Sequence, residues 1–293
     1  MVLVDRTGRM TPVDSAWRGK FGTLALSPDG ARLAVSVTSS DGEQVWVKQL
    51  PTGPLTRLTF GGAANRPAWA PDSRRVAFLS SRAGGRRRAF IQRFDGSAEA
   101  ESLFAHARQV DEVTMTHDGR TAIFRLGSGG SRTRDIVAFT AGVDTVPRAL
   151  VSGVFDEFGA DVAPGDRWFA YVSNESGRSE VYVRRLDDPG AGRTQVSVDG
   201  GEEPRWAHSG RELFFRTRRG EMLVADVTIG ATFSARPPRV LFTASNTATD
   251  PNHRAYDLTR DDRRFVMVNR AVNEIGELVL VLNWFDELRG RSR

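Results

Sequence analysis

The chain of 293 residues contains no cysteine. This absence excludes disulfide bonds, thiolate metal ligands and cysteine nucleophiles. No apolar run approaches the roughly 18 residues that a membrane-spanning helix needs, so we expect no transmembrane segment. The start, Met1-Val2-Leu3-Val4-Asp5-Arg6, also lacks the charged, apolar and small-residue sections of a secretory signal peptide.

Lysine is almost absent, because Lys20 and Lys48 are the only two and every other basic residue is arginine. The net charge of +5 would suit a nucleic-acid partner, but so strong a skew indicates codon composition rather than a phosphate-binding surface. The acidic residues are interspersed, and the one dense basic run, Arg86-Arg87-Arg88, falls where a hairpin turn is expected. We therefore interpret this run as a solvated turn and expect no nucleic-acid partner.

Motifs for catalysis and metal binding are lacking as well. The sequence contains no Gly-x-Ser-x-Gly nucleophile elbow, no Gly-x-x-x-x-Gly-Lys phosphate loop and no His-Glu-x-x-His zinc motif. The four histidines, His106, His117, His208 and His253, are scattered, with no two of them one helical turn apart. These absences predict no catalytic residue, no metal site and no cofactor, and hence a chain that is not an enzyme.

What the chain does contain is a turn that recurs every 43 to 52 residues between two apolar segments. We name its six copies the marker turns. They are Ser27-Pro28-Asp29-Gly30, Ala70-Pro71-Asp72-Ser73, Thr116-His117-Asp118-Gly119, Ala163-Pro164-Gly165-Asp166, Ala207-His208-Ser209-Gly210 and Thr259-Arg260-Asp261-Asp262. Five of the six depart from Pro-Asp-Gly, so the position requires a turn but no particular side-chain chemistry. We accordingly expect His117 and His208 to be turn residues.

Each marker turn is followed by two further strand-like segments and, in most units, a weaker fourth one. The clearest example runs from Trp168 to Val183, where two apolar segments flank a polar turn with one glycine, as in a β-hairpin. Six units of four short strands predict an all-β, six-bladed β-propeller that forms a single domain over residues 1–293. We expect the blades near residues 20–62, 63–107, 108–153, 154–200, 201–243 and 250–288.

The sixth unit shows only three clear strands, the last of them at residues 278–282. A separate strand-like segment, Met1 to Val4, precedes the first unit. We expect residues 1–12 to supply the closing strand of the last blade, because closure protects the exposed edge of a sheet. An open β-solenoid is the alternative, but the period is too long and too rich in turns for it. Trp69 and Trp206 share one repeat position, where we expect aromatic packing between neighbouring blades.

The repeat resembles that of TolB-like propellers, a WD40-like repeat. Pro67-Ala68-Trp69-Ala70-Pro71-Asp72 and Ser81-Arg82-Ala83-Gly84 carry the resemblance best. The opening Val4-Asp5-Arg6-Thr7-Gly8 and the region from Ser173 to Leu288 resemble the C-terminal propeller of bacterial receptor-type serine/threonine protein kinases. This resemblance implies a sensor or scaffold part, since the kinase motifs are missing. It places the chain in the periplasm or outside the cell, whereas a natural start at Met1 would make it cytoplasmic.

Alignment of the units on their marker turns places nine polar residues near the start of the innermost strands. These are Asn65, Arg66, Asp111, Glu112, Asp161, Glu202, Glu203, Arg205 and Asp257. We expect them to line one mouth of the central channel. Their mixed charge argues against a dedicated cation site and suits a polar ligand that is bound by paired charges. Salt bridges between blades, with no ligand, are the alternative interpretation.

These observations predict a non-catalytic, monomeric propeller that binds a protein, a peptide or a small polar ligand at one face. The runner-up is a metal-dependent hydrolase of the lactonase or esterase type that uses the central channel. That alternative comes from resemblance, because lactonase-like six-bladed propellers hold a metal with carboxylates and an asparagine.

Overall fold

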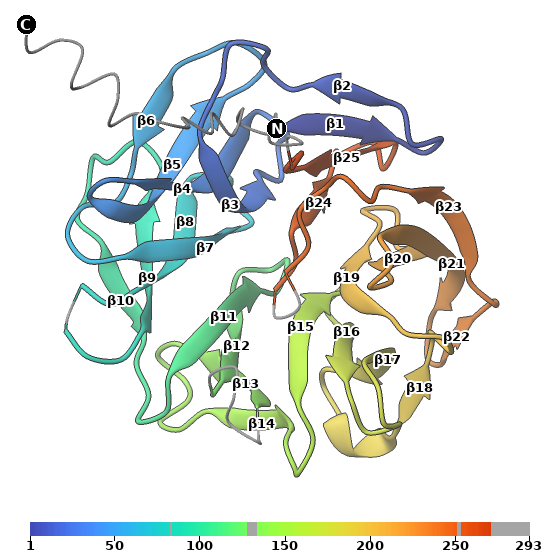
Figure 1. The fold of residues 1–293 in the computed structure, drawn as a ribbon. Coiled ribbons are helices and arrows are strands. Elements are labelled where there is room, and N and C mark those ends of the chain that lie inside the picture. The colour runs from blue at the N-terminus through green and yellow to red at the C-terminus, as the bar shows by residue number, and fades with distance from the viewer. Residues whose placement is uncertain (83, 128–133, 251–252, 271–293) are drawn as a thin grey trace, which may run out of the picture.

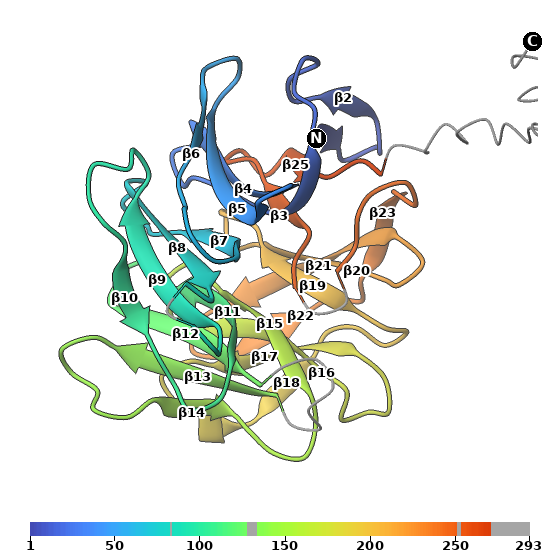
Figure 2. The same ribbon diagram turned by 60° about the vertical axis from the view of Figure 1, so that its left-hand side comes forward.

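The structure is a computed structural model that describes residues 1–82, 84–127, 134–250 and 253–270. Six antiparallel sheets stand in a ring around a central axis, as Figure 1 shows from one end and Figure 2 from the side. The predicted all-β, six-bladed propeller is therefore confirmed. Within the described part of the chain, no helix is long and apolar enough to cross a membrane.

The first three blades follow one another along the chain. Blade I consists of β3 (Lys20–Leu26), β4 (Arg32–Ser39), β5 (Gly42–Gln49) and β6 (Leu55–Arg57). Blade II consists of β7 (Ala64–Trp69), β8 (Arg75–Ser80), β9 (Arg88–Arg93) and β10 (Glu101–Phe104). Blade III consists of β11 (Val110–Met115), β12 (Thr121–Leu126), β13 (Asp135–Thr140) and β14 (Arg148–Val151).

The next two blades differ in their outer strands. Blade IV consists of β15 (Glu157–Val162), β16 (Trp168–Ser173), β17 (Glu180–Arg185) and β18 (Arg193–Gln195). Blade V consists of β19 (Glu202–Trp206), β20 (Glu212–Arg216), β21 (Glu221–Ile229), β22 (Phe233–Ala235) and β23 (Arg239–Thr243). The long strand β21 pairs with β22 near its end and with β23 near its start, so blade V carries an extra hairpin.

Blade VI joins the two ends of the described chain. It consists of β24 (Tyr256–Leu258), β25 (Arg264–Met267), β1 (Val2–Asp5) and β2 (Met10–Pro12). β1 pairs with β25 in antiparallel register, from Val2 opposite Met267 to Asp5 opposite Arg264. The predicted closure of the last blade by the N-terminal strand is thus confirmed.

The details of this closure differ from our expectation of a single edge strand. The N-terminal segment supplies two strands, because the turn after β1 folds back as a hairpin. Asp5 Oδ1 accepts hydrogen bonds from Thr7 N (2.9 Å) and Arg9 N (3.0 Å), and Gly8 takes a left-handed φ of 87°. β1 occupies the place beside β25 that we assigned to residues 278–282, which lie outside the described residues.

The core lies between the blades rather than within any one of them. Every residue of β16 is buried, which fits a sheet that is covered on both faces. One cluster joins Ala25 and Val47 of blade I to Trp69 and Phe78 of blade II. The Trp69 indole Nε1 also donates to Ala25 O of the preceding blade (2.9 Å), and Trp206 Nε1 donates to Asp161 O (3.1 Å). The expected packing of these two tryptophans between blades is confirmed.

Candidate functional site at the channel mouth

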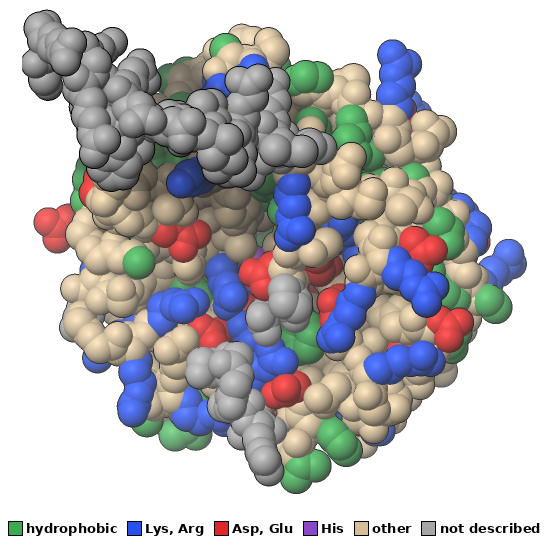
Figure 3. Space-filling model, viewed as in Figure 1, with side chains coloured by type: hydrophobic (Ala, Val, Ile, Leu, Met, Phe, Trp, Pro, Cys, Tyr) green, Lys and Arg blue, Asp and Glu red, His purple; other side chains and the backbone are tan. Residues whose placement is uncertain are grey.

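The first strand of each blade lines the central axis, and the marker turn follows it. All six marker turns therefore lie at one end of the channel, which we call the marker-turn face. The hairpins between the second and third strands lie at the opposite end, the hairpin face. Figure 3 looks onto the hairpin face.

A cavity of about 270 Å³ opens at the marker-turn end of the channel. Its floor is made of four charged side chains from three blades: Asp161, Arg205, Arg254 and Asp257. Its wall and rim are made of Trp69, Trp206, Met115, Thr114, Pro28, Pro71, Pro164, His117 and His208. The cavity thus combines an ionic floor with an apolar wall, which is the usual character of a ligand pocket.

The floor is a chain of alternating charges. Asp161 Oδ1 accepts from Arg205 Nη1 at 2.8 Å and from Arg254 Nη1 at 2.9 Å. Arg205 Nε lies 2.9 Å from Asp257 Oδ1. Burial opposes ionisation of the Asp161 carboxyl, but Arg205 and Arg254 outweigh it and lower its pKa. The floor thus alternates two carboxylates with two guanidinium groups, and their formal charges cancel.

The carboxylates also tie neighbouring blades together. Asp161 Oδ2 accepts from Trp206 N of the next blade (2.8 Å), and Asp257 Oδ2 accepts from Leu26 N across the closure (2.8 Å). Nearer the hairpin face, Glu112 accepts from Gly159 N (2.8 Å). Glu203 likewise accepts from Ala255 N (2.9 Å). Each of these four predicted carboxylates thus contacts a neighbouring blade, as the alternative interpretation expected.

The structure separates the nine predicted residues by depth. Asp161, Arg205 and Asp257 form the cavity floor. Arg66, Asp111 and Glu112 lie nearer the hairpin face, where Arg125 Nε contacts Glu112 Oε2 at 3.2 Å and His253 Nδ1 contacts Glu112 Oε1 at 3.1 Å. Burial opposes ionisation of Glu112, but Arg125 and His253 outweigh it and lower the pKa to about 2.

The remaining predicted residues have other partners. Glu203 lies with buried Arg216 at 3.9 Å, and burial raises the pKa of its carboxyl to about 7. Asn65 Nδ2 donates to Glu43 Oε2 at 2.7 Å. Glu202 Oε1 accepts from the exposed Arg218 Nε at 2.9 Å and lines a groove between blades IV and V. The nine residues therefore do not share one mouth.

Two histidines on the rim are held by the following blade. His117 N and Nδ1 lie 2.7 and 2.9 Å from Asp166 Oδ1. His208 N and Nδ1 both lie 2.8 Å from Asp262 Oδ1. A carboxylate accepts hydrogen bonds, so Nδ1 carries the hydrogen and a neutral ring keeps Nε2 as an acceptor. Both residues lie in turns as expected, but the turn pattern did not indicate these partners.

Sequence reasoning also missed Arg125, Arg216 and Arg254. A charged residue inside an otherwise apolar strand was the available signal for the first two. Arg125 follows Ile123 and Phe124, and Arg216 follows Leu213 to Phe215. Both arginine side chains are only 1% exposed. Arg254 precedes the short strand β24, and its sequence surroundings carry no comparable signal.

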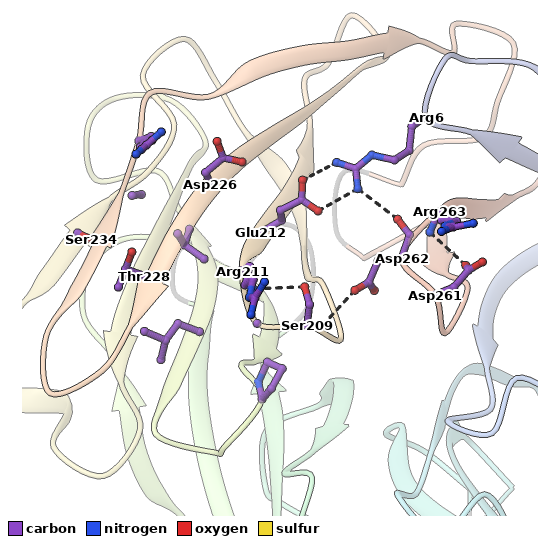
Figure 4. A pocket seen from close by; sticks show the side chains of 16 residues that line it. Arg6, Ser209, Arg211, Glu212, Asp226, Thr228, Ser234, Asp261, Asp262 and Arg263 are labelled. Atoms are coloured by element: carbon purple, nitrogen blue, oxygen red, sulfur yellow. Dashed lines mark hydrogen bonds and ion pairs between the residues drawn. The ribbon is translucent and has the colours of Figure 1, made fainter.

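A wide groove adjoins the cavity on the marker-turn face and shares Pro164 with it. The groove has a volume of about 1380 Å³ and lies between the marker turns of blades V and VI and the extra hairpin of blade V. Figure 4 shows Arg6 reaching across it to Glu212 and to the backbone of Asp262. This N-terminal arginine therefore also fastens the closing strands to blade V.

The acidic side chains around the channel are engaged by arginines and by backbone amides rather than gathered into a cation cage. In the part of the chain that the structure describes, no group of three or more His, Cys, Asp or Glu side chains is arranged to hold a metal ion.

Comparison with known proteins identifies the fold. No protein-family model and no curated sequence matches the chain. The structure described as a TolB of Agrobacterium tumefaciens superposes with a TM-score of 0.70 at 17% identity, over 92% of this chain and 96% of that one. TolB from Acinetobacter baumannii superposes with a TM-score of 0.54 at 14% identity, over 85% of this chain and 63% of that one. A chain of the nidogen/laminin complex superposes with a TM-score of 0.57 at 14% identity, over 77% of this chain and 88% of that one. The chain therefore has the fold of TolB-type six-bladed β-propellers.

Proposed function

We propose that this chain is a non-catalytic, monomeric binding propeller that takes a polar peptide or a small polar ligand at the marker-turn mouth of its channel. The observation that carries the proposal is the cavity floor, where Arg205 and Arg254 are 21% and 17% exposed while their partner Asp161 is 1% exposed. The acidic groups are thus covered, and the guanidinium groups are the charged surface that a ligand meets.

The donor capacity of these arginines supports a ligand with carbonyl or carboxylate oxygens. A guanidinium has five N–H donors, and Arg254 uses only Nη1 in the contacts described. Its buried Nε has no hydrogen-bond partner within the described structure. The apolar wall of Trp69, Trp206 and Met115 would cover the less polar parts of such a ligand. A peptide offers both kinds of group at short spacing.

One structural neighbour comes from a complex between two proteins, nidogen and laminin. That likeness supports a binding role only at the level of the fold, because propellers serve many functions. We further propose that the chain is the sensor or scaffold part of a receptor-type kinase system. The reading frame upstream of Met1 tests this idea: it should encode a kinase domain and a transmembrane helix, and an in-frame stop directly before Met1 would refute it.

The binding site itself is tested with a displayed random-peptide library selected on the intact chain. Selected peptides should lose at least about tenfold in affinity for Ala68→Phe, which fills the channel beside the cavity floor. Arg254→Met should weaken the same peptides by removing donors while Arg205 still neutralises Asp161. Ala149→Phe, at an exposed position of β14, is the matched control and should bind normally. Equal binding to wild type and Ala68→Phe would contradict the proposed site.

A thermal-shift measurement separates this proposal from the hydrolase alternative. A metal held in the channel would stabilise the folded state, so calcium would raise Tm and EDTA would lower it. We expect no shift with either, because Asp161, Asp257 and Glu112 are already bound to arginines and backbone amides. A clear calcium-dependent rise would instead favour the hydrolase.

A further inference from the structure

We infer that the hairpin face over blades II and III is a second interaction surface, which binds an acidic segment of a partner protein. It is built from six arginines, which we call the hairpin-face arginine cluster: Arg66, Arg82, Arg86, Arg87, Arg88 and Arg108. This surface lies at the opposite end of the channel from the cavity, so the inference is independent of the proposed function. Figure 3 shows basic side chains gathered there, to the left of and below the centre.

At the inner edge of the cluster, one carboxylate is shared by three guanidinium groups. Asp111 lies 3.1 Å from Arg87, 3.9 Å from Arg66 and 3.8 Å from Arg125. Gln109 Nε2 also donates to it at 2.8 Å. Arg125 has a second acidic partner, Glu112 at 3.2 Å, whereas the next carboxylate oxygen to Arg66 is that of Asp250 at 3.9 Å. The three guanidinium groups at this edge thus face three carboxylates, but Arg66 reaches its two carboxylates only at 3.9 Å.

The outer part of the cluster carries still less acidic compensation. Arg86 Nη1 donates to Ala107 O (2.5 Å), and Arg86 and Arg88 are exposed. Arg82 packs over the rings of Phe78 and Phe90, and its Nε and Nη2 are buried with no hydrogen-bond partner among the described residues. No described carboxylate lies within ion-pair distance of these three guanidinium groups. Among the outer arginines of the cluster, Arg108 is the one with a described acidic partner, Asp135.

An apolar side chain borders the cluster. Phe60, in the connection from blade I to blade II, is 65% exposed, with the Arg57 guanidinium 4.9 Å from its ring centre. The same connection touches the blade II hairpin, because a Cβ added to Gly62 would lie 2.7 Å from Arg82 Cα. A partner that crosses the arginines thus meets an aromatic ring at their border, and such rings are frequent anchors in protein interfaces.

The arrangement favours an acidic protein segment over a nucleic acid. Asp111, Asp135 and Asp250 lie among the arginines and would repel a continuous phosphate backbone, which in duplex DNA carries a charge about every 1.7 Å. A peptide can place its carboxylates opposite Arg86, Arg87 and Arg88 and its uncharged residues opposite the aspartates. Guanidinium groups bind such carboxylates with charge-assisted hydrogen bonds.

The test uses a short fluorescein-labelled oligoglutamate peptide and the intact chain, with binding read by fluorescence anisotropy at low salt. The double variant Arg86→Ser/Arg88→Ser should bind about tenfold more weakly, since two exposed guanidinium contacts are lost. The matched control is Arg218→Ser/Arg219→Ser, which removes the same charge from the blade V hairpin of the same face. We expect this control to retain at least half of the wild-type affinity, and Tm to show that both variants fold.

Two outcomes would overturn the inference. Equal losses in both double variants would show a response to net charge alone. A single-stranded oligonucleotide of equal charge that binds more tightly than the peptide, and that loses affinity in Arg86→Ser/Arg88→Ser, would assign the surface to nucleic acid instead. Preferential loss of peptide binding in Arg86→Ser/Arg88→Ser, together with weaker oligonucleotide binding, would support the acidic segment.

Discussion

At the scale of single residues, the carboxylates around the channel have two structural tasks at once. Asp161 pairs with Arg205 and Arg254 through one oxygen and accepts a hydrogen bond from the backbone N–H of Trp206 with the other. Its side chain is 1% exposed, so water cannot replace either partner readily. This one aspartate therefore both joins two neighbouring blades and balances part of the positive charge of the cavity floor.

We predict that Asp161→Asn lowers the free energy of unfolding by about 3 kcal/mol, because it leaves two guanidinium groups partly buried with one carboxylate. Urea denaturation measures this loss. Asp187→Asn is the matched control, since Asp187 pairs with Arg185 at 2.7 Å on the exposed surface and should cost less than about 0.5 kcal/mol. Similar costs for both variants would contradict the assigned role of Asp161.

The buried carboxyl of Glu157, at the start of β15, should make the stability of the fold depend on pH. Burial raises the pKa of its carboxyl from 4.5 to about 7; Ser173 opposes this shift, and Asp135, Asp156 and Glu175 add to it. The unfolded chain then releases this proton at lower pH than the folded chain, so ionisation destabilises the fold as pH rises from 4.5 through 7. Glu157→Gln should become more stable than wild type over this range, by about 2 kcal/mol at its upper end. Urea denaturation across this pH range tests the prediction, with the exposed Glu99→Gln as the control. A difference in the free energy of unfolding between Glu157→Gln and wild type that stays constant with pH would refute it.

At the scale of the strand, a recurring irregularity positions the contacts between blades. The register of the inner strand shifts at equivalent places in β3, β7, β15 and β19. Arg66, Gly159 and Glu203 occupy one repeat position there, with left-handed φ values of 51°, 65° and 57°. The N–H groups of Arg66 and Gly159 thereby meet Thr23 and Glu112 of the preceding blades. The bulge is thus the device that turns a backbone donor toward the neighbouring blade.

We predict that Gly159→Ala costs about 1 kcal/mol, because alanine strains a left-handed backbone. Space is sufficient, since the added Cβ would lie 3.5 Å from Pro204 Cδ and from Val172 Cγ2. Gly153→Ala is the control, where the backbone is not left-handed and no atom lies within 4 Å of the added Cβ. Thermal unfolding should separate the two variants, and an unchanged Tm for Gly159→Ala would contradict the assigned backbone strain.

The marker turns made the blades predictable, because a turn of fixed spacing can be found from local sequence alone. The hydrogen bonds between the marker turns of neighbouring blades could not be predicted. Ser73, Asp166 and Asp262 each bind the turn of the preceding blade, so the turns are tied in pairs I–II, III–IV and V–VI. Such a contact joins residues 44 to 54 positions apart and depends on the ring geometry.

Alignment on the marker turns found the repeat positions of the site but not their depths. Arg66, Glu112 and Glu203 lie two residues before the position of Asp161, Arg205 and Asp257, and two strand residues span roughly 7 Å. That rise is enough to move a side chain from one end of a narrow channel toward the other. Depth along the axis is a property of the assembled ring, and it decides which of these charges reach the cavity.

At the scale of the whole molecule, the closure of the ring depends on the first twelve residues. Val4 is fully buried in a cluster with Phe214 of blade V and Phe265 of blade VI, and Arg6 binds Glu212. Local pattern could not decide this pairing, because residues 2–5 and 278–282 are both strand-like and either would suit the edge of β25. The contacts across the ring favour β1 there.

We predict that deletion of residues 1–12 abolishes cooperative thermal unfolding and causes association in size-exclusion chromatography, because it exposes the edge of β25 and the apolar cluster around Phe265. Thr11→Asp, on the exposed outer strand β2, keeps the closure and should unfold like wild type. A truncated chain that stays monomeric with an unchanged Tm would show that the ring closes without this segment.

The register of the closure also determines how the molecule would respond to mechanical tension. Val2 lies opposite Met267, so the backbone leaves β1 and β25 at the same end of their shared ladder. A force that separates these two ends loads one residue pair at a time, as in unzipping, rather than all of them together in shear. If the flanking chain were tethered on both sides, blade VI would open first under modest tension, and β1 with β2 would detach while blades I to V remained paired.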